Sequence, residues 1–315
     1  MSLRVAVLMD PIESIHIEKD STFAMLLEAQ RRGHSLLYVT QEALAVRDAA
    51  PWGHAAALRV RDDASGWFSL ETPRWVDLRS VDVILARRDP PFDAQFLYDT
   101  MVLELAQRAG VLVVNDPQAL RDANEKLFSL HFPQCIPPTI VARDSGEIKR
   151  FVAEHGDVVV KPLDGMGGRS IFRSGRGDPN LNVILETLTD EGRAFAVAQR
   201  YLKEIRDGDR RVLLIDGEPV PYVLARMPQG DDFRGNLARG GKGVGQPISD
   251  RERWIAAQVA PELRRRGMLF VGLDVIGDWL TEVNVTSPTC IRELDAQFGL
   301  NIAGILFDAI EARHT

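Results

Sequence analysis

The first hydrophobic residues of the chain form short apolar runs separated by a segment with helical periodicity. The runs cover 3–9 and 36–39. Between them, 20–33 carries apolar residues at helical spacing, with Asp20 or Ser21 as the N-cap. Strand, helix and strand in this order indicate a β-α-β unit, whose strands pair in parallel. Such a sheet binds ligands outside the carboxyl ends of its strands, so we expect functional groups there.

The same alternation continues and completes an α/β domain. An apolar strand is predicted over 81–86, a helix over 93–108 and a further strand over 111–114. Residues 41–80 carry tryptophans among polar residues and show no clear period, so no element is predicted there.

A second region begins after a helical segment and a group of prolines. The helical pattern covers 117–132, with Asn124-Glu125-Lys126 in its middle, and Pro133, Pro137 and Pro138 then break it. The prolines mark the predicted domain boundary. After them, the pattern predicts strands at 139–141, 158–161, 195–199, 211–215 and 220–226, helices at 147–155, 181–188, 250–266 and 302–313, and a hairpin of strands at 268–276 and 280–286.

A glycine-rich loop follows the strand that ends in Lys161. The loop contains Gly165, Gly167 and Gly168, which leave the backbone free to take positive φ and to direct several N–H groups at one anion. Its spacing matches neither the P-loop nor the dinucleotide-binding motif, and a second short strand rather than a helix follows it. We therefore interpret it as a flap over phosphates, with a tight hairpin as the structural alternative.

Two further segments place basic residues in loops. Met227 to Gln246 is rich in charged residues and glycine and lacks apolar periodicity. This composition predicts a long mobile loop that carries Arg234, Arg239 and Lys242, or a disordered surface insertion. An apolar strand also runs into Arg87-Arg88, which indicates either an anion contact or a structural role.

An acidic pair marks the last predicted hairpin. Glu282 and Asn284 are two residues apart, so a strand places both side chains on one face. Two such groups between apolar neighbours favour a hard divalent cation such as Mg²⁺. Asp274 joins them only if it opposes Glu282, which requires a three-residue turn, because a two-residue turn at Gly277-Asp278 points it to the other face. The stretch 286–290 then offers hydroxyl and backbone N–H groups, which bind a carboxylate or cap the next helix.

Composition and charge narrow the class of protein. The 315 residues are 45% hydrophobic, enough to bury the cores of two or three domains, and the formal net charge of -7 argues against a nucleic-acid surface. No apolar run approaches the ~18 residues that cross a bilayer, so no membrane association is expected. Cys135 and Cys290 lie far apart and the histidines are scattered, so we expect a reducing cytosol and no zinc site.

Several of these motifs occur together in one known family. Besides the glycine loop and Asn124-Glu125-Lys126, the chain carries Asp10-Pro11, Lys19-Asp20-Ser21, Arg87-Arg88-Asp89-Pro90-Pro91-Phe92-Asp93 and Glu282-Val283-Asn284-Val285-Thr286-Ser287-Pro288-Thr289. In these motifs and their spacing, it resembles the bacterial glutathione synthetases of the ATP-grasp superfamily. The resemblance runs from the first strand to Glu311-Ala312-Arg313 and is least distinctive over 41–80.

The resemblance implies an α/β and α+β protein, in which an N-terminal parallel-sheet domain precedes an ATP-grasp fold. The N-terminal substrate domain would cover 1–122. An ATP-grasp lid subdomain would cover 123–202, and a catalytic subdomain with a mobile loop at 227–246 would cover 203–315.

The resemblance also implies roles for residues at matching positions. ATP would be bound by Lys126 and Lys161, by the flap residues Asp164, Gly165, Met166, Gly167 and Gly168, by Gln199, Tyr201 and Leu202 at the adenine, and by Asp209 at the ribose. A divalent metal, Mg²⁺ or alternatively Mn²⁺, would be bound by Asp274, Glu282 and Asn284. The dipeptide γ-glutamylcysteine would be held by Arg226, Arg234, Ser287, Pro288 and Thr289, and Arg211 or Arg226 would stabilise charge on its reacting carboxylate.

The implied activity is ATP-dependent ligation of γ-glutamylcysteine and glycine to glutathione, by a cytoplasmic homotetramer. Because a carboxylate is a poor electrophile, ATP converts it to an acyl phosphate, which the amine of glycine attacks without any protein nucleophile. Two alternatives stay open. One is another ATP-grasp carboxylate-amine ligase, such as a D-alanine–D-alanine ligase, and the other is a nucleotide-binding protein without catalytic activity.

Overall fold

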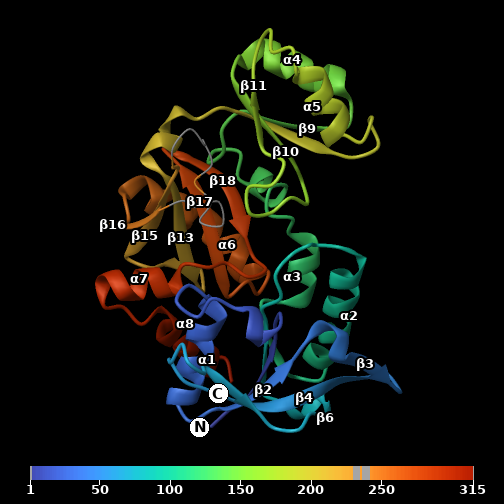
Figure 1. Ribbon diagram of the computed structural model, residues 1–315, viewed down its shortest axis with the longest axis vertical. Helices are drawn as coiled ribbons and strands as arrows, with labels where there is room; N and C mark the ends of the chain where they lie inside the picture. Colours follow the sequence, from blue (N-terminus) through green and yellow to red (C-terminus); the bar gives the residue numbers. More distant parts are fainter. Residues whose placement is uncertain (1, 230–234, 236–241, 315) are drawn as a thin grey trace.

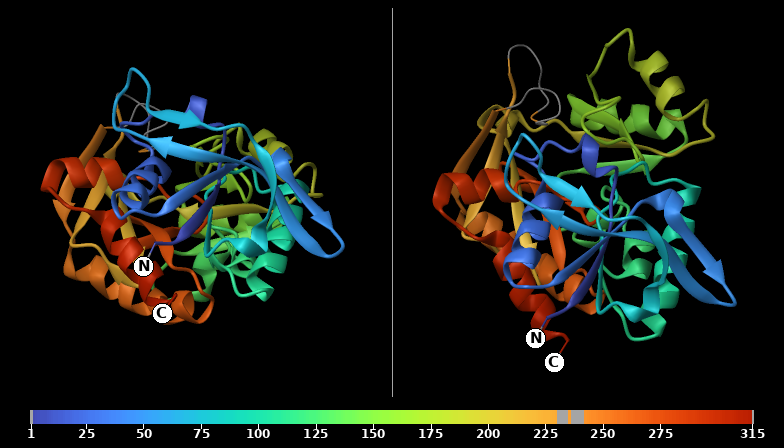
Figure 2. Two further views of the ribbon diagram at one scale, coloured as in Figure 1. Left: turned by 90° about the horizontal axis from the view of Figure 1, so that it is seen from below. Right: turned by 60° about the horizontal axis from the view of Figure 1, so that its bottom comes forward.

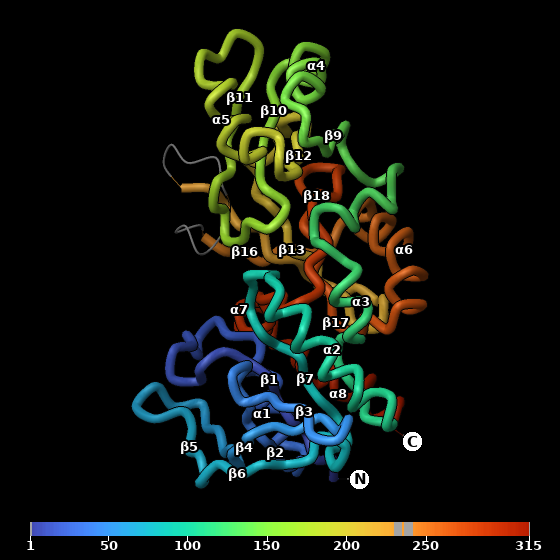
Figure 3. Tube along the Cα trace, turned by 90° about the vertical axis from the view of Figure 1, so that its right-hand side faces the viewer, coloured from blue at the N-terminus to red at the C-terminus, as the bar shows by residue number. Residues whose placement is uncertain are grey.

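Three sheets lie one above another along the long axis of the molecule (Figures 1 and 3). The computed structural model describes residues 2–229, 235 and 242–314. The first sheet takes its strands from the N-terminal third of the chain, the second from the middle and the third from the C-terminal part. The predicted mixture of a parallel-sheet domain with α+β subdomains is confirmed.

The first sheet has a parallel centre, as the β-α-β pattern predicts. Its parallel strands, in spatial order, are β2 (Ser35–Val39), β1 (Arg4–Leu8), β7 (Val83–Ala86) and β8 (Leu112–Val114). Helices α1 (Ser21–Arg31) and α2 (Ala94–Arg108) begin where predicted, because Asp20 and Asp93 accept hydrogen bonds from backbone N–H groups of the first turn.

Residues 41–80, where the sequence predicts no element, extend this sheet with antiparallel strands. They form β3 (Leu44–Arg47), β4 (Ala50–Val60), β5 (Phe68–Leu70) and β6 (Arg74–Asp77). Pro51 and Gly53, which usually interrupt strands, hide β4 in the sequence. Pro51 pairs with Val46 of β3 and lies beyond the pairing of β4 with β6, so one of its sides is an edge where a missing N–H is tolerated. The β3–β4 ribbon projects from the body of the sheet (Figure 2).

The single helix predicted over 117–132 is wrong. α3 (Pro117–Asp122) ends early, and after an irregular segment only a 3-10 turn, η4 (Phe128–His131), follows. The side chain of Asn124 accepts hydrogen bonds from the backbone N–H groups of Lys126 and Leu127, both at 3.1 Å, and so replaces helical bonds with a local turn. Lys126 therefore lies on a loop rather than in a helix.

The second sheet is small and wholly antiparallel. Its strands, in spatial order, are β11 (Phe172–Ser174), β10 (Val158–Pro162), β12 (Ala196–Arg200) and β9 (Thr139–Ala142). Helices α4 (Ser145–His155) and α5 (Leu181–Leu188) cover one of its faces and enclose a separate core (Figure 1). The glycine loop connects β10 to β11, so it lies between two strands as the flap interpretation requires.

The third sheet is antiparallel and forms the middle of the molecule. Its strands, in spatial order, are β16 (Lys242–Pro247), β15 (Tyr222–Met227), β13 (Asp209–Ile215), β17 (Phe270–Ile276) and β18 (Trp279–Asn284), with the short β14 (Glu218–Pro219) beside β13. Helix α6 (Asp250–Arg265) packs beside it and begins at a capping box formed by Ser249 and Glu252.

The long loop predicted from Met227 to Gln246 is wrong at its ends. Met227 closes β15, and the last residues of the predicted loop belong to β16, which pairs Lys242 with Met227. The alternating glycines of β16 conceal the strand, because they leave no side-chain pattern to read. Gly245 is needed there, since a Cβ would lie 2.2 Å from the Phe298 ring. Arg234 and Arg239 lie outside the described residues.

The first and third sheets are joined by shared packing. Helices α7 (Ile291–Phe298) and α8 (Ile302–Ala312) leave the third sheet and return to α1, so the two chain ends lie close together (Figure 2). The Asn115 side chain donates to the carbonyls of Phe270 and Val285 at 2.8 and 2.7 Å and accepts from the Phe270 N–H. These contacts fix the N-terminal domain to the middle sheet.

The described residues also bear on the state of the two cysteines and on membrane-spanning helices. Cys135 and Cys290 are both buried free thiols, in line with the absence of a predicted disulfide. Among the described helices, none combines the length and apolar character that a membrane crossing requires.

Candidate active site

The polar residues of the third sheet gather on one of its faces. Opposed residues in antiparallel strands share a face, as do residues two apart along one strand. By this rule, one face of β13, β15, β17 and β18 carries Asp209, Arg211, Arg226, Asp274, Glu282 and Asn284. Residues separated by up to 75 positions in the chain thus meet because the strands are adjacent in space.

The β17–β18 hairpin reaches this arrangement by a route other than the predicted one. Its strands pair across a two-residue turn, so the predicted three-residue turn is wrong. A β-bulge then leaves Thr281 without an opposing residue, and Asp274 pairs with Glu282. The Thr281 hydroxyl donates to the Asp274 carbonyl at 3.1 Å and so supports the bulge. The prediction that both carboxylates share a face is confirmed. The extra residue of the bulge shifts the pairing by one position, and a three-residue turn would shift it in the same way.

Two arginines and two aspartates form a buried network on this face. Arg211 donates to both carboxylate oxygens of Asp274, at 2.5 and 3.0 Å. Arg226 joins the network through Nη2, which lies 2.8 Å from Asp274 Oδ2 and 2.5 Å from Asp209 Oδ2. Bidentate and shared ion pairs of this kind hold guanidinium groups in one orientation. Both arginines are therefore fixed in place beneath the cavity described below.

Burial and charge together set the protonation of this network. Burial raises the pKa of Asp209 to about 7, even beside Arg226. Burial also opposes ionisation of Asp274, but the guanidinium groups of Arg211 and Arg226 outweigh it and hold the pKa of that carboxyl well below its usual range. The network therefore surrounds the ionised carboxylate of Asp274 with two guanidinium groups.

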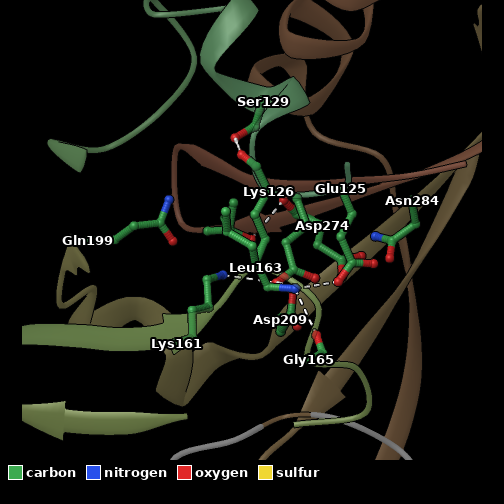
Figure 4. A network of polar contacts seen from close by, with 12 residues as sticks. Glu125, Lys126, Ser129, Lys161, Leu163, Gly165, Gln199, Asp209, Asp274 and Asn284 are labelled. Atoms are coloured by element: carbon green, nitrogen blue, oxygen red, sulfur yellow. Dashed lines mark hydrogen bonds and ion pairs between the residues drawn. The ribbon is translucent and has the colours of Figure 1, made fainter. Parts of the chain in front are cut away.

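Two buried lysines, Lys126 and Lys161, approach the polar face from outside the third sheet (Figure 4). Lys161, near the end of β10, donates to Glu282 Oε1 at 2.9 Å, and Lys126 Nζ lies 3.8 Å from the same oxygen. Lys126 also contacts Glu125 and donates to the carbonyl of Gly165 at 2.8 Å. Although burial opposes its ionisation, Glu282 has a lowered pKa because both lysines stabilise the carboxylate. The flap, the loop at Lys126 and β18 thus converge on one point.

The oxygen donors around Glu282 fit a hard divalent cation. Asn284 donates its amide Nδ2 to the Gly272 carbonyl at 3.3 Å, which leaves its own amide oxygen available as a ligand. Asp274 is less available, since both of its oxygens accept hydrogen bonds from arginines. Within the described ranges, no group of three or more His, Cys, Asp or Glu side chains is arranged to hold a metal ion. A cation here would depend on Glu282, Asn284 and oxygens from a bound phosphate.

A cavity of about 220 Å³ joins the arginine network to the lysines and the flap. It brings together most of the residues singled out in the sequence, namely Lys126, Lys161, Gly165, Met166, Gly167, Gly168, Arg211, Arg226, Asp274, Glu282, Asn284, Ser287, Pro288 and Thr289. Its lining includes two lysines and three arginines, since Arg169 joins the four basic residues just named, and this positive charge suits a polyanion next to a carboxylate.

A smaller cavity of about 90 Å³ adjoins the first and shares Lys161 and Glu282 with it. Gln199, Tyr201, Leu202 and Asp209 line it, together with apolar residues of both sheets. Gln199 donates its amide to the Thr139 hydroxyl at 3.2 Å, so that amide group is held by the second sheet. Asp209 Oδ1 is buried and has no hydrogen-bond partner among the described residues. A flat apolar ring with a hydroxylated sugar suits this combination.

Of the predicted residues that the structure describes, Asp164 is the one that lines neither of these cavities. Asp164 lines a small neighbouring cavity of about 30 Å³ rather than the main one, and Arg234 lies outside the described residues. Among the lining residues without a predicted role, Glu125 and Asp89 have polar contacts at the site. Glu125 contacts Lys126, and Asp89 accepts a hydrogen bond from the Ser287 hydroxyl. Both belong to motifs noted in the sequence, but their neighbours become known only once the chain is folded.

Comparison with known proteins agrees with this geometry. Residues 3–121 match the N-terminal domain of prokaryotic glutathione synthetase, and residues 125–299 match its ATP-grasp domain. The glutathione synthetase of Xanthomonas campestris is 66% identical over 312 residues, which cover 99% of each chain. That of Pseudomonas aeruginosa is 59% identical over 313 residues, with 99% of each chain covered.

Solved structures resemble the whole chain at much lower identity. The D-cycloserine synthetase DcsG has a TM-score of 0.68 at 16% identity, with 99% of this chain and 100% of that chain covered. The ATP-grasp ligase PsnB, solved with a minimal precursor, Mg and ADP, has a TM-score of 0.63 at 18% identity and 98% coverage of both chains. At this identity the likeness concerns the fold alone, and the fold is ATP-grasp. Together with the matches over the full length, it shows that the chain belongs to the prokaryotic glutathione synthetase family.

Proposed function

We propose that this protein is an ATP-dependent ligase that joins γ-glutamylcysteine and glycine to form glutathione, with release of ADP and phosphate. One observation carries the proposal: a single cavity holds two buried lysines and a glycine flap at one side and two fixed arginines at the other. The first side suits the phosphates of a nucleotide and the second suits a carboxylate substrate. Membership of the glutathione synthetase family supports this choice of substrates.

In the proposed complex, the nucleotide lies across the two adjoining cavities. The adenine would occupy the smaller cavity beside Gln199, Tyr201 and Leu202, and the ribose would meet the unpartnered Oδ1 of Asp209. The phosphates would then reach Lys161, which lines both cavities, and Lys126. The amides of the flap, 164–168, would cover them from the side of the second sheet.

A divalent cation, Mg²⁺ or Mn²⁺, would be held by Glu282 and Asn284, with Asp274 as a further candidate ligand. When bound, it supplies neutralisation of the phosphate charge. Lys161 and Lys126, which pair with Glu282 in this structure, would also neutralise phosphate charge by contacting phosphate oxygens.

The reaction then needs positioning rather than a protein nucleophile. The cysteinyl carboxylate attacks the terminal phosphorus of ATP, and ADP leaves as the acyl phosphate forms. The glycine amine attacks the acyl carbon, loses a proton, and phosphate leaves. Arg211 and Arg226 would stabilise the negative charge on the carboxylate and on the tetrahedral intermediate, and their position in the lining of the cavity supports this role.

ADP release separates this proposal from its alternatives. We expect the protein with ATP, Mg²⁺, γ-glutamylcysteine and glycine to release ADP and form glutathione, and to release little ADP with D-alanine. ADP release with D-alanine alone would identify a sibling ligase of the same fold. ATP binding without turnover under either condition would identify a nucleotide-binding protein.

Three further features of the proposal rest on the family resemblance. The domain limits at 122 and 202, the homotetramer and the cytoplasmic location stay predictions. Sedimentation of the purified protein tests the assembly directly, since a tetramer and a 35.1 kDa monomer sediment at clearly different rates.

A further inference from the structure

The loop that follows β7, 87–93, lies against the glycine flap. Both segments line the small cavity of about 30 Å³, to which the loop contributes Pro90 and Phe92 and the flap region contributes Leu163 and Met166. A cavity of this volume has room for about one or two water molecules, so the residues around it are close neighbours. The flap region therefore adjoins the N-terminal domain as well as the main cavity, through apolar residues on both sides.

Hydrogen bonds hold the start of the flap in place. Asn124 and Lys126 donate to backbone carbonyls there, at 3.0 and 2.8 Å, and Figure 4 shows the second of these bonds. Met166 follows these bonds, is exposed, and adjoins the loop across the small cavity. A methionine side chain is flexible and packs on an apolar surface opposite it. The loop supplies that surface, so it helps to set the position of the flap.

The segment from Asp89 to Phe92 is stiff and is anchored at both ends. The two prolines between these residues fix φ at about −65° and make the segment semi-rigid. At one end, the Asp89 N–H donates to Asp10 Oδ2 at 2.8 Å. At the other end, the Phe92 ring packs against Phe96 of α2, with ring centroids 5.0 Å apart. A displacement of Asp89 would therefore be transmitted along the segment to Phe92.

Asp89 also borders the place proposed for the dipeptide. Its carboxylate accepts a hydrogen bond from the Ser287 hydroxyl, and both residues line the main cavity together with Thr289. In the proposed complex, Ser287 and Thr289 hold γ-glutamylcysteine. A dipeptide bound there would contact Asp89 or compete with it for the Ser287 hydroxyl. The loop thus extends from the proposed dipeptide position to the flap that would cover the nucleotide.

We propose that Pro90 and Phe92 are positioning residues for the flap, and that through Asp89 they make its closure over the nucleotide depend on the bound dipeptide. This inference rests on the proposed function, because it requires the nucleotide beneath the flap and the dipeptide at Ser287. Such coupling serves the chemistry, since the flap then shields the phosphates from water when the carboxylate that attacks them is present. By linkage, the nucleotide must tighten binding of the dipeptide by the same factor.

The coupling is measured as a ratio of two dissociation constants. The Kd of the ATP analogue AMP-PNP with Mg²⁺ is determined without and with saturating γ-glutamylcysteine, and for wild type we expect the first to exceed the second about tenfold. Phe92→Ala should lower this ratio to about 2, because the flap then loses the surface on which it closes. The affinity of this variant for the dipeptide alone should stay that of wild type, since Phe92 does not line the main cavity.

Two more variants separate coupling from a loss of folded protein. Met166→Ala changes the other side of the small cavity and should lower the ratio as Phe92→Ala does, with little further loss in the double variant. Because Met166 is exposed, this variant tests the inference even where Phe92→Ala destabilises the domain. Tyr98→Ala changes an exposed aromatic residue of α2 outside the cavity lining and is the matched control, which should keep the ratio of wild type.

Trypsin provides a readout of the flap itself. Arg169 is exposed and directly follows the flap, so cleavage after it reports the open state. In wild type, AMP-PNP together with the dipeptide should slow this cleavage about tenfold more than AMP-PNP alone. In Phe92→Ala and Met166→Ala, the dipeptide should add little protection.

The outcomes separate this inference from the proposed function. A ratio near 1 in an active wild type, or a wild-type ratio in Phe92→Ala and Met166→Ala, overturns the inference alone. Equal losses of AMP-PNP affinity with and without dipeptide would make Phe92 a fixed support and would also overturn the coupling. A drop as large in Tyr98→Ala would do the same. If wild type releases no ADP with γ-glutamylcysteine and glycine, the proposed function fails and this inference fails with it.

Discussion

The second sheet and the third sheet contribute to the same cavity but are held in the molecule in different ways. The second sheet has a core of its own, enclosed by α4 and α5. The third sheet shares two continuous cores with the N-terminal domain and is bonded to it through Asn115 and Arg87. Near the candidate active site, polar contacts join the second sheet and its flap to the rest, such as Lys161 to Glu282 and Asn124 to the Leu163 carbonyl.

This difference assigns a physical role to each region. The third sheet shares its hydrophobic cores with the N-terminal domain, and this keeps Arg211, Arg226 and Asp274 in fixed relative positions, as catalysis by positioning requires. A region with a separate core, joined there by ion pairs that a nucleotide and a metal ion would compete for, is free to adjust when they bind. The comparison therefore predicts that damage to the two regions will have separable effects.

The largest expected effect comes from breaking the main ionic contact between the regions. We expect Lys161→Ala to lower kcat/KM for ATP by about 10³-fold, or about 4 kcal/mol, because it removes a buried cation that we propose contacts the phosphates. Lys149→Ala, an exposed lysine of α4 in the same region, should leave kcat/KM unchanged. Steady-state ADP release measures both. Similar rates for the two variants would show that Lys161 has no role at the nucleotide.

A matched pair of core substitutions sharpens the comparison. Leu185 on α5 and Leu263 on α6 are both fully buried, the first in the separate core and the second in the shared core. Each Leu→Ala change should cost about 3 kcal/mol. Hydrogen exchange should show Leu185→Ala loosening only 139–200, and Leu263→Ala loosening the N-terminal domain and third sheet together. Loosening of the whole chain by both variants would mean that the regions unfold as one unit.

The arginine network should give a somewhat smaller effect, confined to the chemical step. We expect Arg211→Ala and Arg226→Ala each to lower kcat by about 100-fold, since each removes a preorganised cation that, in the proposed complex, lies next to the reacting carboxylate. Arg206→Ala, an exposed arginine of the same subdomain, is the control. Single-turnover measurements separate chemistry from product release. An unchanged kcat in both network variants would exclude a role for these arginines in catalysis.

The smallest expected effect concerns acid stability of the N-terminal domain. Hydrogen bonds from Arg31 and Arg32 outweigh burial and lower the pKa of Glu28 from 4.5 to about 2. Because the folded-state pKa is depressed, the ionised carboxylate stabilises the fold above pH 4.5, and this contribution is lost as the pH falls toward 2. Glu28→Gln should cost about 1 kcal/mol at neutral pH and flatten the decline of Tm on acidification. Thermal melts across this range test it, and parallel curves for both proteins would contradict it.

The pattern of the sequence predicts the elements well where local signals agree. Asp20, Asp93 and Ser249 begin helices because each provides a cap ahead of an apolar period. Prediction from the sequence pattern fails where a local signal is overridden, as at Pro51 in β4, or where the signal is absent, as in the glycine-rich β16. Strand pairing there depends on neighbours distant in the chain, which no local window contains.

The site shows the same division. The spacing of Glu282 and Asn284 predicts their common face directly, but the bulge at Thr281 leaves no mark that distinguishes it from a longer turn. The ion pair of Lys161 with Glu282 joins residues 121 positions apart, and the bond from Arg87 to Pro288 spans 201. Family motifs identify the site residues in the sequence, whereas the residues that they contact are known only from the three-dimensional structure.

The return of α8 to α1 has a consequence for the order in which the chain acquires structure during synthesis. Ile302, Leu306, Phe307 and Ile310 share one core with β1 and α1. As the ribosome adds residues from the N-terminus, the first sheet emerges early but keeps an apolar surface uncovered until these late residues follow. The N-terminal domain is thus synthesised before the third sheet but completes its packing only after it, so the finished core reports that the third sheet has already been made.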